Sequence, residues 1–307
     1  RGWELSVNWR DQIGKVGYRV GFNLSDSQSK IVKYNSNESG ILTSALSNGS
    51  TFWNYYEGKD LGEIWGYEYD GFYTVDDFTD TSSWKLKEGV PSIDGYNPRP
   101  GDVKFKNLKD DDRGTNMISS GDNTVSNPGD RKVIGNNTPR YLYGITLGAN
   151  FKGFDLNVFM QGTGKRDAWI ANNLKFPLYS DFKFIALYKD LGNYWKPVDA
   201  ANGDYTAANP NAEFPRIYGN YGNQGSNYRQ SDKYLSDASY FRIKNVTLSY
   251  TFPKAWITKA SLSQLKAFVS IENLATFSSL PKGIDPETLS WNYPAFRTVS
   301  FGLNVTL

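Results

Sequence analysis

Strict alternation of apolar and polar residues is the feature that most limits how this chain can fold. In the last eleven residues, RTVSFGLNVTL, apolar side chains occupy every second position, at Val299, Phe301, Leu303, Val305 and Leu307. Successive side chains of an extended strand point to opposite faces. The segment is therefore predicted to be a strand with one apolar face and one polar face.

The same two-residue period recurs along the chain and predicts a series of antiparallel strands. It is found in residues 3–10, 16–25, 141–151, 154–161, 245–252 and 265–273. The links at 11–15, 152–153 and 253–263 are short, whereas those at 26–139, 163–238 and 275–296 are long. Short and long links alternate, so in an up-and-down meander all the long loops leave from one rim of the sheet.

This asymmetry predicts the fold class, which is an all-β, antiparallel transmembrane β-barrel wall of about seven strands with long extracellular loops. Outer-membrane barrels combine short periplasmic turns with long extracellular loops. Aromatic residues near strand ends, such as Trp3, Trp9 and Phe151, suit the interfacial girdles of such a barrel. A soluble all-β domain remains open, because its strands alternate in the same way.

The strand count leaves the predicted wall incomplete. A bilayer tolerates no open sheet edge, and bacterial barrels close with an even number of strands. The chain begins at Arg1, already within a strand-like segment. We therefore expect further strands N-terminal to Arg1, with residues 1–307 forming one portion of a larger barrel.

The composition excludes several kinds of chemistry. The chain has no Cys and no His, which rules out thiolate nucleophiles, Ser-His-Asp arrangements and zinc sites built on those ligands. Paired carboxylates at 76–77 and 110–112 lie in predicted loops, and the QGTGK segment at 161–165 lacks the spacing of a phosphate-binding loop. The balance of 34 basic and 32 acidic residues argues against a nucleic-acid partner. We predict that the protein is not an enzyme.

Eight stretches form a series that extends over most of the chain. They are IWGYEYDGFYTVDDF, PGDVKFKNL, DRKVIGNNTPRYLYGITLGANFKGFDLNVFMQGTGKRD, NPNAEFPR, SYFRIKNVTLSYTFPKAW, LKAFVSIENLATFS, GIDPE and YPAFRTVSFGLNVTL. In this order and at these spacings, the series resembles the C-terminal part of a SusC/RagA-type TonB-linked outer-membrane transporter. The order is far more specific than any single stretch.

The resemblance implies a protein much larger than this chain, with a plug domain inside a barrel of about 22 strands. Residues 1–307 would contain neither the plug nor the N-terminal strands of the barrel. Such transporters lie in the outer membrane of Gram-negative bacteria, in contact with its lipid. They draw energy from TonB through the plug and work with a SusD-like surface lipoprotein. The implied function is the import of an oligosaccharide or peptide nutrient.

Two other functions stay open at this point. A soluble β-rich carbohydrate-binding or adhesive module would remain in the aqueous fraction, whereas an importer would need detergent. A passive porin would continue to import its solutes when TonB is deleted.

The last strand departs from the family at one position. Relatives usually end in an aromatic residue, which the barrel assembly machinery reads together with the alternating strand, but this chain ends in Leu307. The apolar alternation of Val299, Phe301, Leu303, Val305 and Leu307 is kept. We therefore expect these five residues to act as the barrel assembly signal.

The loop before DRKVIG is a candidate Ca²⁺ site. Relatives often carry D-x-N-G-D-G-x-I-x-x-x-D-R there, with the spacing of a calcium loop, whereas this chain has KDDDRGTNMISSGDNTVSNPGDR. Asp122 and Asp130 match later ligands, Asp112 is a candidate for the unclear first position, and Asn123 stands where a Gly belongs. The alternative is an acidic loop that is merely solvated. No other cofactor is predicted.

The long loops are rich in aromatic residues, which suit sugar rings, peptides and protein interfaces alike. The residues predicted to contact the substrate or the lid protein are Trp65, Tyr67, Trp84, Trp195 and Tyr218. The alternative is that these rings pack loop against loop. Helical spacing also predicts a short helix near 180–191, which would pack the second long loop.

Overall fold

The computed structural model describes residues 1–46, 51–93, 95–110, 116–170, 176, 189–218, 226–258, 261–289 and 295–307. The chain divides into two compact units. The sheet unit comprises residues 1–29, 138–168 and 236–307, and the loop unit comprises residues 30–137 and 169–235.

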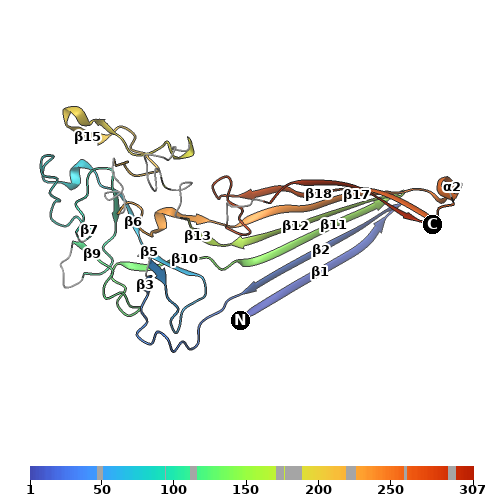
Figure 1. The fold of residues 1–307 in the computed structure, drawn as a ribbon, viewed down its shortest axis with the longest axis horizontal. Helices are drawn as coiled ribbons and strands as arrows, with labels where there is room; N and C mark the ends of the chain where they lie inside the picture. The colour runs from blue at the N-terminus through green and yellow to red at the C-terminus, as the bar shows by residue number, and fades with distance from the viewer. Residues whose placement is uncertain are drawn as a thin grey trace. The chain divides into compact units, whose positions relative to one another are not determined.

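The sheet unit is a seven-stranded antiparallel meander whose strands lie in chain order. The strands are β1 (Gly2–Ile13), β2 (Val16–Ser27), β11 (Arg140–Phe151), β12 (Phe154–Lys165), β17 (Tyr240–Thr251), β18 (Gln264–Ser278) and β19 (Thr298–Thr306). Figure 1 shows them side by side as long arrows, with the C-terminus at the same end of the sheet as helix α2 (Lys254–Ile257). Each predicted strand segment falls within one of these strands to within one residue, at the ends predicted at 252, 297 and 307, so the predicted wall is confirmed.

The short links lie at one end of the sheet, here called the turn end. Lys152 and Gly153 join β11 to β12 with φ values of 46° and 91°, the left-handed conformation that two-residue hairpins of type I′ require. The link predicted at 11–15 is too long, because Asp11 pairs with Tyr18 and Ile13 with Val16 before the chain turns. The polar Asp11 interrupts the sequence pattern, but it does not interrupt the ladder. The long loops leave from the opposite end, here called the loop end.

The register places the apolar positions of all seven strands on one face. One row of directly paired residues crosses the whole sheet and comprises Trp9, Val20, Leu147, Val158, Val246, Ile271 and Val299. Many side chains on this face are exposed, among them Trp9 at 60% and Phe301 at 80%. An exposed apolar surface of this size needs an apolar environment, as a barrel wall in lipid would have.

Two β-bulges change the alternation near the loop end of β17 and β18. Between β12 and β17 the register shifts so that Lys244 is the extra residue, between Ile243 and Asn245. Opposite it in β18, Asn273 adopts a φ of 51°. A bulge adds one residue to one strand and re-aims the side chains beyond it. As a result, Arg242 lies on the same face as Asn245, although the two are three positions apart and regular alternation would place them on opposite faces.

The loop unit consists of short paired strands and helical turns. Its strands are β3 (Thr43–Ala45), β4 (Thr51–Trp53), β5 (Glu63–Tyr67), β6 (Tyr69–Phe72), β7 (Ser92–Ile93), β8 (Val103–Phe105), β9 (Met117–Ile118), β10 (Arg131–Asn136), β14 (Pro197–Asp199) and β15 (Asp204–Ala207). Strands β13 (Asp167–Trp169) and β16 (Leu235–Asp237) lie where the chain passes from one unit to the other. The helical turns are η1 (Val75–Asp77), η2 (Lys189–Leu191), η3 (Ala200–Asn202) and η4 (Asp232–Tyr234).

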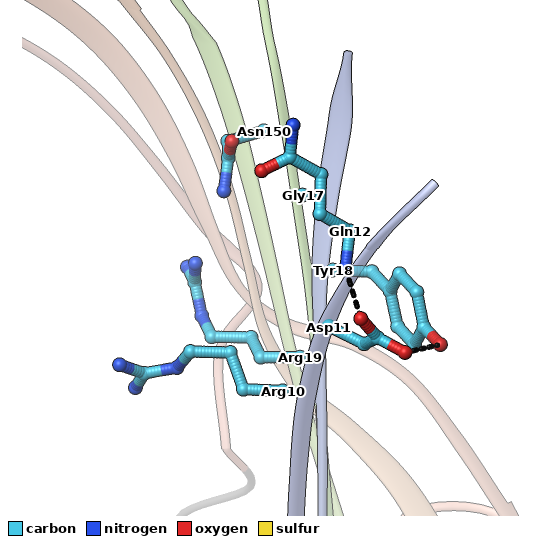
Figure 2. Close-up of a pocket in the computed structure, with 7 residues that line it drawn as sticks. All are labelled: Arg10, Asp11, Gln12, Gly17, Tyr18, Arg19 and Asn150. Carbon is cyan, nitrogen blue, oxygen red and sulfur yellow. Dashed lines mark hydrogen bonds between the residues drawn. The ribbon is translucent and has the colours of Figure 1, made fainter. Parts of the chain in front are cut away.

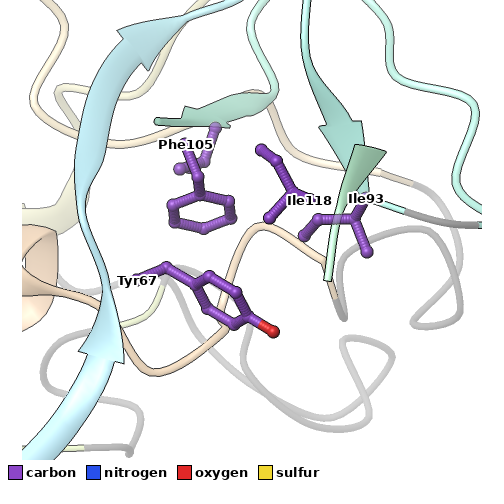
Figure 3. Packing of buried hydrophobic residues seen from close by; sticks show 5 residues of the cluster. Tyr67, Ile93, Phe105 and Ile118 are labelled. Carbon is purple, nitrogen blue, oxygen red and sulfur yellow. The ribbon is translucent and has the colours of Figure 1, made fainter. Parts of the chain in front are cut away.

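Clusters of buried aromatic and aliphatic side chains hold the loop unit together. The cluster in Figure 3 comprises Tyr67, Ile93, Val103, Phe105 and Ile118, drawn from four of the short strands. Of the helix predicted near 180–191, residues 180–188 lie outside the described part of the chain, and 189–191 form η2. No helix in the described ranges is long and apolar enough to cross a membrane.

Candidate functional site

The face of the sheet opposite the apolar rows is a hydrogen-bonded polar surface. Arg19 on β2 reaches across to Asp155 on β12, with nitrogen to oxygen distances of 3.2 to 3.4 Å, and also donates to Asn157. Thr247 on β17 and Ser270 on β18 share a hydrogen bond of 2.8 Å. The polar face therefore suits contact with water and with polar solutes.

Two arginines lie directly opposite each other on this face, near the turn end. Figure 2 shows Arg10 and Arg19 extending side by side, while Asp11 and Tyr18 extend to the other side of the sheet. With Gln12 they line part of a pocket of about 560 Å³. Like charges that face each other across strands are destabilising. Asp155 offsets the charge of Arg19, whereas Arg10 has no ion-pair partner in the described part of the chain.

A second polar cluster lies on the same face near the loop end, and sequence reasoning missed it. Arg242 on β17 is almost completely buried and binds Asp285 and Glu287 from the loop that follows β18. The only sequence signal for it is the GIDPE stretch, in which two acids flank a proline at 285–287. The alternation of β17 hides Arg242, because the bulge at Lys244 reverses the pattern.

In the loop unit, the carboxylate of Asp102 has no exposed surface and accepts hydrogen bonds from four different residues. Its Oδ2 accepts hydrogen bonds from the Tyr96 hydroxyl at 2.8 Å, the Tyr218 hydroxyl at 2.5 Å and the backbone N–H of Arg99 at 2.7 Å. Its Oδ1 accepts from Nδ2 of Asn227 at 2.9 Å. Burial raises the pKa of Asp102, and burial together with this carboxylate raises the pKa of Tyr218.

The structure buries three of the five aromatic residues predicted to contact substrate or lid. Trp65 donates from Nε1 to Glu63 at 2.8 Å, and the Tyr67 ring packs on Phe105 with 5.4 Å between centroids. Trp195 covers Gly101, where an added Cβ would lie 2.3 Å from the indole. In the conformation observed, these three rings stabilise the loop unit.

The other two predicted contact residues are partly exposed. The Trp84 ring meets Tyr205 edge-on at 4.8 Å. Tyr218 binds Asp102, and the guanidinium carbon of Arg216 lies 4.9 Å from the centroid of the Tyr218 ring. Contact between any of the five aromatic residues and a ligand or a lid stays a prediction.

The candidate calcium ligands Asp130 and Asp122 differ in burial and in their hydrogen bonds. Asp130 is fully buried, and its carboxylate accepts backbone N–H bonds from Leu108 and Ser119 at 2.7 Å and from Lys109 at 3.0 Å. Asp122 is exposed and binds Thr124. Asp112 lies outside the described residues, and within the described ones no group of three or more acidic side chains is placed to hold a metal. Calcium binding stays a prediction.

The five residues of the predicted assembly signal lie on or directly after β19, all on the apolar face. Val299, Leu303 and Val305 pair with Ile271, Ala267 and Leu265 of β18. Phe301 and Leu307 are the most exposed of the five. This placement agrees with the predicted strand pattern, and recognition by the assembly machinery stays a prediction.

The antiparallel meander, its continuous exposed apolar face and its hydrogen-bonded polar face define a segment of an outer-membrane β-barrel wall. No family model matches the sequence. The curated relatives are TonB-dependent receptors of Formosa agariphila. The receptor P3 is 28% identical over 99% of this chain, and the receptors P26 and P39 are each 22% identical over 100% and 99% of it. The chain spans 28–30% of the length of these receptors.

Solved structures show the same fold. The RagAB peptide transporter matches with a TM-score of 0.62 and 19% identity over 99% of this chain and 29% of that chain. Its "closed-closed" and "open-open" states match with TM-scores of 0.60 and 0.58. The chain is thus similar over nearly its whole length to TonB-dependent receptors and has the fold of an outer-membrane transporter, which confirms the resemblance seen in the sequence. The matched proteins are receptors and transporters, not enzymes.

Proposed function

We propose that this chain forms part of the barrel wall and outer loops of a transporter that imports an oligosaccharide or a peptide across the outer membrane. The observation that carries the proposal is the register of the sheet. It places exposed apolar rows on one face and Arg19, Asp155 and Asn157 on the other. A wall with lipid on one side and a hydrated path on the other needs this arrangement.

In this proposal the wall makes and breaks no covalent bonds. It supplies shape and polar contacts to a passing solute, and the loop unit supplies an outer surface. The cross-strand bonds of Arg19 keep its guanidinium in place on the polar face. A polar solute could then exchange its water contacts for those of the wall.

The remaining parts of the proposal concern the rest of the transporter. Because the chain spans 28–30% of the receptors it matches, we propose that residues 1–307 are the C-terminal portion of the barrel. The plug and the N-terminal strands would lie elsewhere in the protein. TonB would act through the plug, and a SusD-like lipoprotein would cover the outer loops.

Two observations bear on the solute. The matched solved structures are described as a peptide transporter, which favours a peptide. The partly exposed Trp84 and Tyr218 lie beside Arg99 and Arg216, and such surfaces accept sugar rings as well. The proposal therefore keeps both solute classes.

Uptake by the native host tests the proposal. Cells with and without the gene would be supplied with a tryptic casein digest or with a maltodextrin series, and depletion of each component would be followed by mass spectrometry. We expect deletion of the gene to abolish uptake of either the peptides or the maltodextrins, and we expect deletion of TonB to have the same effect. Uptake that persists without TonB would indicate a passive porin.

Fractionation separates the proposal from the soluble alternative. We expect the full-length protein to need detergent for extraction and to migrate differently on gels before and after heating. A protein that stays in the aqueous fraction would be a soluble binding or adhesive module instead.

A further inference from the structure

The loop between β18 and β19 carries a segment that folds back over the polar face of the sheet. This segment, residues 280–289, is here called the strap. The row of residues beneath it comprises Gln161 on β12, Arg242 on β17 and Thr276 on β18, which pair directly across the three strands. The polar side chains of this row connect the strap to the wall.

Arg242 is the centre of this connection. Only 2% of its side chain is exposed. One guanidinium nitrogen donates to Asp285 at 2.8 Å, another pairs with Glu287, and Nε donates to Thr276 at 2.9 Å. A planar guanidinium reaches the three partners from three separate nitrogens in a fixed geometry, whereas an ammonium donates from a single nitrogen.

Further bonds attach the strap on either side of Arg242. Gln161 donates to Glu287 at 2.6 Å, and Lys244 lies 3.1 Å from the same carboxylate. Arg166, just after β12, donates to the backbone carbonyls of Pro286 and Glu287 at 3.1 and 3.3 Å. The strap is thus bound to two strands and to the start of a neighbouring loop.

The strap is also braced internally. Asp285 accepts the backbone N–H of Glu287 at 2.8 Å through its side chain, and its own carbonyl accepts from Leu289 at 2.8 Å. The side chains of Leu280 and Ile284 are buried. A segment whose acidic side chains are paired and whose apolar side chains are covered has little to gain from moving.

We propose that the strap is a fixed lining of the solute path that narrows the loop end of the polar face and thereby limits the size of the solutes that pass, with Arg242 as its positioning residue. The inference rests on the proposed function, because it requires that solutes travel along the polar face. A fixed lining differs from a gate, which would have to detach from the wall in each transport cycle.

Cross-linking tests whether the strap stays in place. The chain has no native Cys, so Lys244→Cys with Glu287→Cys adds the only thiols of this segment and leaves the bond between Arg242 and Asp285 intact. A short bis-methanethiosulfonate reagent would join the two thiols in the full-length transporter on cells. We expect the double variant to take up the imported probe series equally well before and after cross-linking. Loss of uptake that a reductant restores would show a moving gate and overturn the proposal.

Release of the strap tests its effect on solute size. In Arg242→Met we expect more tryptic cleavage after Lys282. We also expect this variant to import larger members of the probe series than the parent transporter does. The rate per surface-exposed transporter should stay the same for small members. The size profile of Arg242→Lys should lie between those of the parent and of Arg242→Met, because a lysine can pair with only part of the acidic cluster. Lys282→Met, which changes a strap charge outside the cluster, is the matched control and should leave the size profile unchanged.

The outcomes separate the two proposals. If the parent transporter imports neither probe series in a TonB-dependent manner, the proposed function fails. If the parent imports a series and Arg242→Met frees the strap without changing the size profile, the strap proposal fails alone. If Arg242→Met does not reach the outer membrane, Asp285→Asn replaces it in the size assay, and the cross-linked pair decides whether the strap is fixed.

Discussion

Asp102 illustrates how one buried carboxylate can organise a long loop. It binds side chains or backbone from residues 96 and 99, which are close to it in the sequence, and from residues 218 and 227, which are distant. Three of the four donors converge on a single oxygen. The sequence shows this residue only as part of PGDVKFKNL, because nothing in a local pattern reveals partners more than one hundred residues away.

We expect Asp102→Asn to loosen the loop unit. An amide cannot accept from all four donors, because one orientation directs its NH₂ group at three of them and the other directs it at Asn227. A buried donor left without an acceptor costs about 1–3 kcal/mol. Limited proteolysis of the full-length protein on cells would measure the change. Asp80→Asn is the control, since Asp80 is exposed and binds only nearby residues such as Ser82 and Ser83; equal protease sensitivity in the two variants would contradict the expectation.

Glu68 provides a dependence on pH. Lys106 and Lys132 both bind its carboxylate and lower its pKa from 4.5 to about 2. Because the folded pKa lies below the ordinary value, the stabilisation is complete above pH 4.5 and is lost as the pH falls towards 2. We expect protease resistance of the loop unit to fall over this range, with a smaller fall in Glu68→Gln. Both lysines are exposed, so added salt should weaken the effect; an identical pH profile in the variant would show that Glu68 has no part in it.

The acidic loop allows a test of metal binding. If the Ca²⁺ prediction holds, chelation should increase protease cleavage around residues 109–129, and Ca²⁺ should restore protection. Asp122→Asn should weaken the response to Ca²⁺ while leaving the N–H bonds of Asp130 intact. Protection that is the same with chelator and with Ca²⁺ would leave Asp130 as a structural residue alone.

At the scale of the strand, β19 offers two adjacent positions on opposite faces. Phe301 is 80% exposed on the apolar face, while Ser300 points to the polar face. An arginine on a lipid-facing position of a barrel costs up to about 2–4 kcal/mol near the bilayer midplane, whereas the lumen side tolerates it. We expect Phe301→Arg to reduce the amount of assembled protein in the outer membrane and Ser300→Arg to have little effect, as measured by the heat-modifiable band. A reversed order would mean that the faces are assigned the wrong way round.

The strands themselves could be predicted because a period of two is visible in the sequence without knowledge of their partners. The bulges could not be predicted in this way. The alternation breaks at Lys244 and Asn273, so a prediction from the sequence begins or ends a strand there. In the structure the strand pairing continues through Arg242 and Tyr240 to the loop end. This is why the polar row beneath the strap escaped prediction.

At the scale of the whole molecule, the interleaved short and long links were enough to predict the order of the meander and its class. The inner organisation of the loop unit was not predictable, because its strands are two to six residues long and most pair with segments distant in the sequence. The aromatic residues of these loops were read as contact residues from their chemistry. Burial then separated Trp65, Tyr67 and Trp195 from the more accessible Trp84 and Tyr218.

The outer edges of β1 and β19 have no neighbouring strand in the described part of the chain. Each edge presents a row of backbone amides and carbonyls that hydrocarbon cannot satisfy, at several kcal/mol per group. Recombinant production of this stretch by itself should therefore give inclusion bodies or ribbon-like aggregates joined edge to edge. If residues 1–307 are the C-terminal portion of a larger barrel, as proposed above, biochemical work on them calls for the full-length protein, in which further strands would pair with both edges.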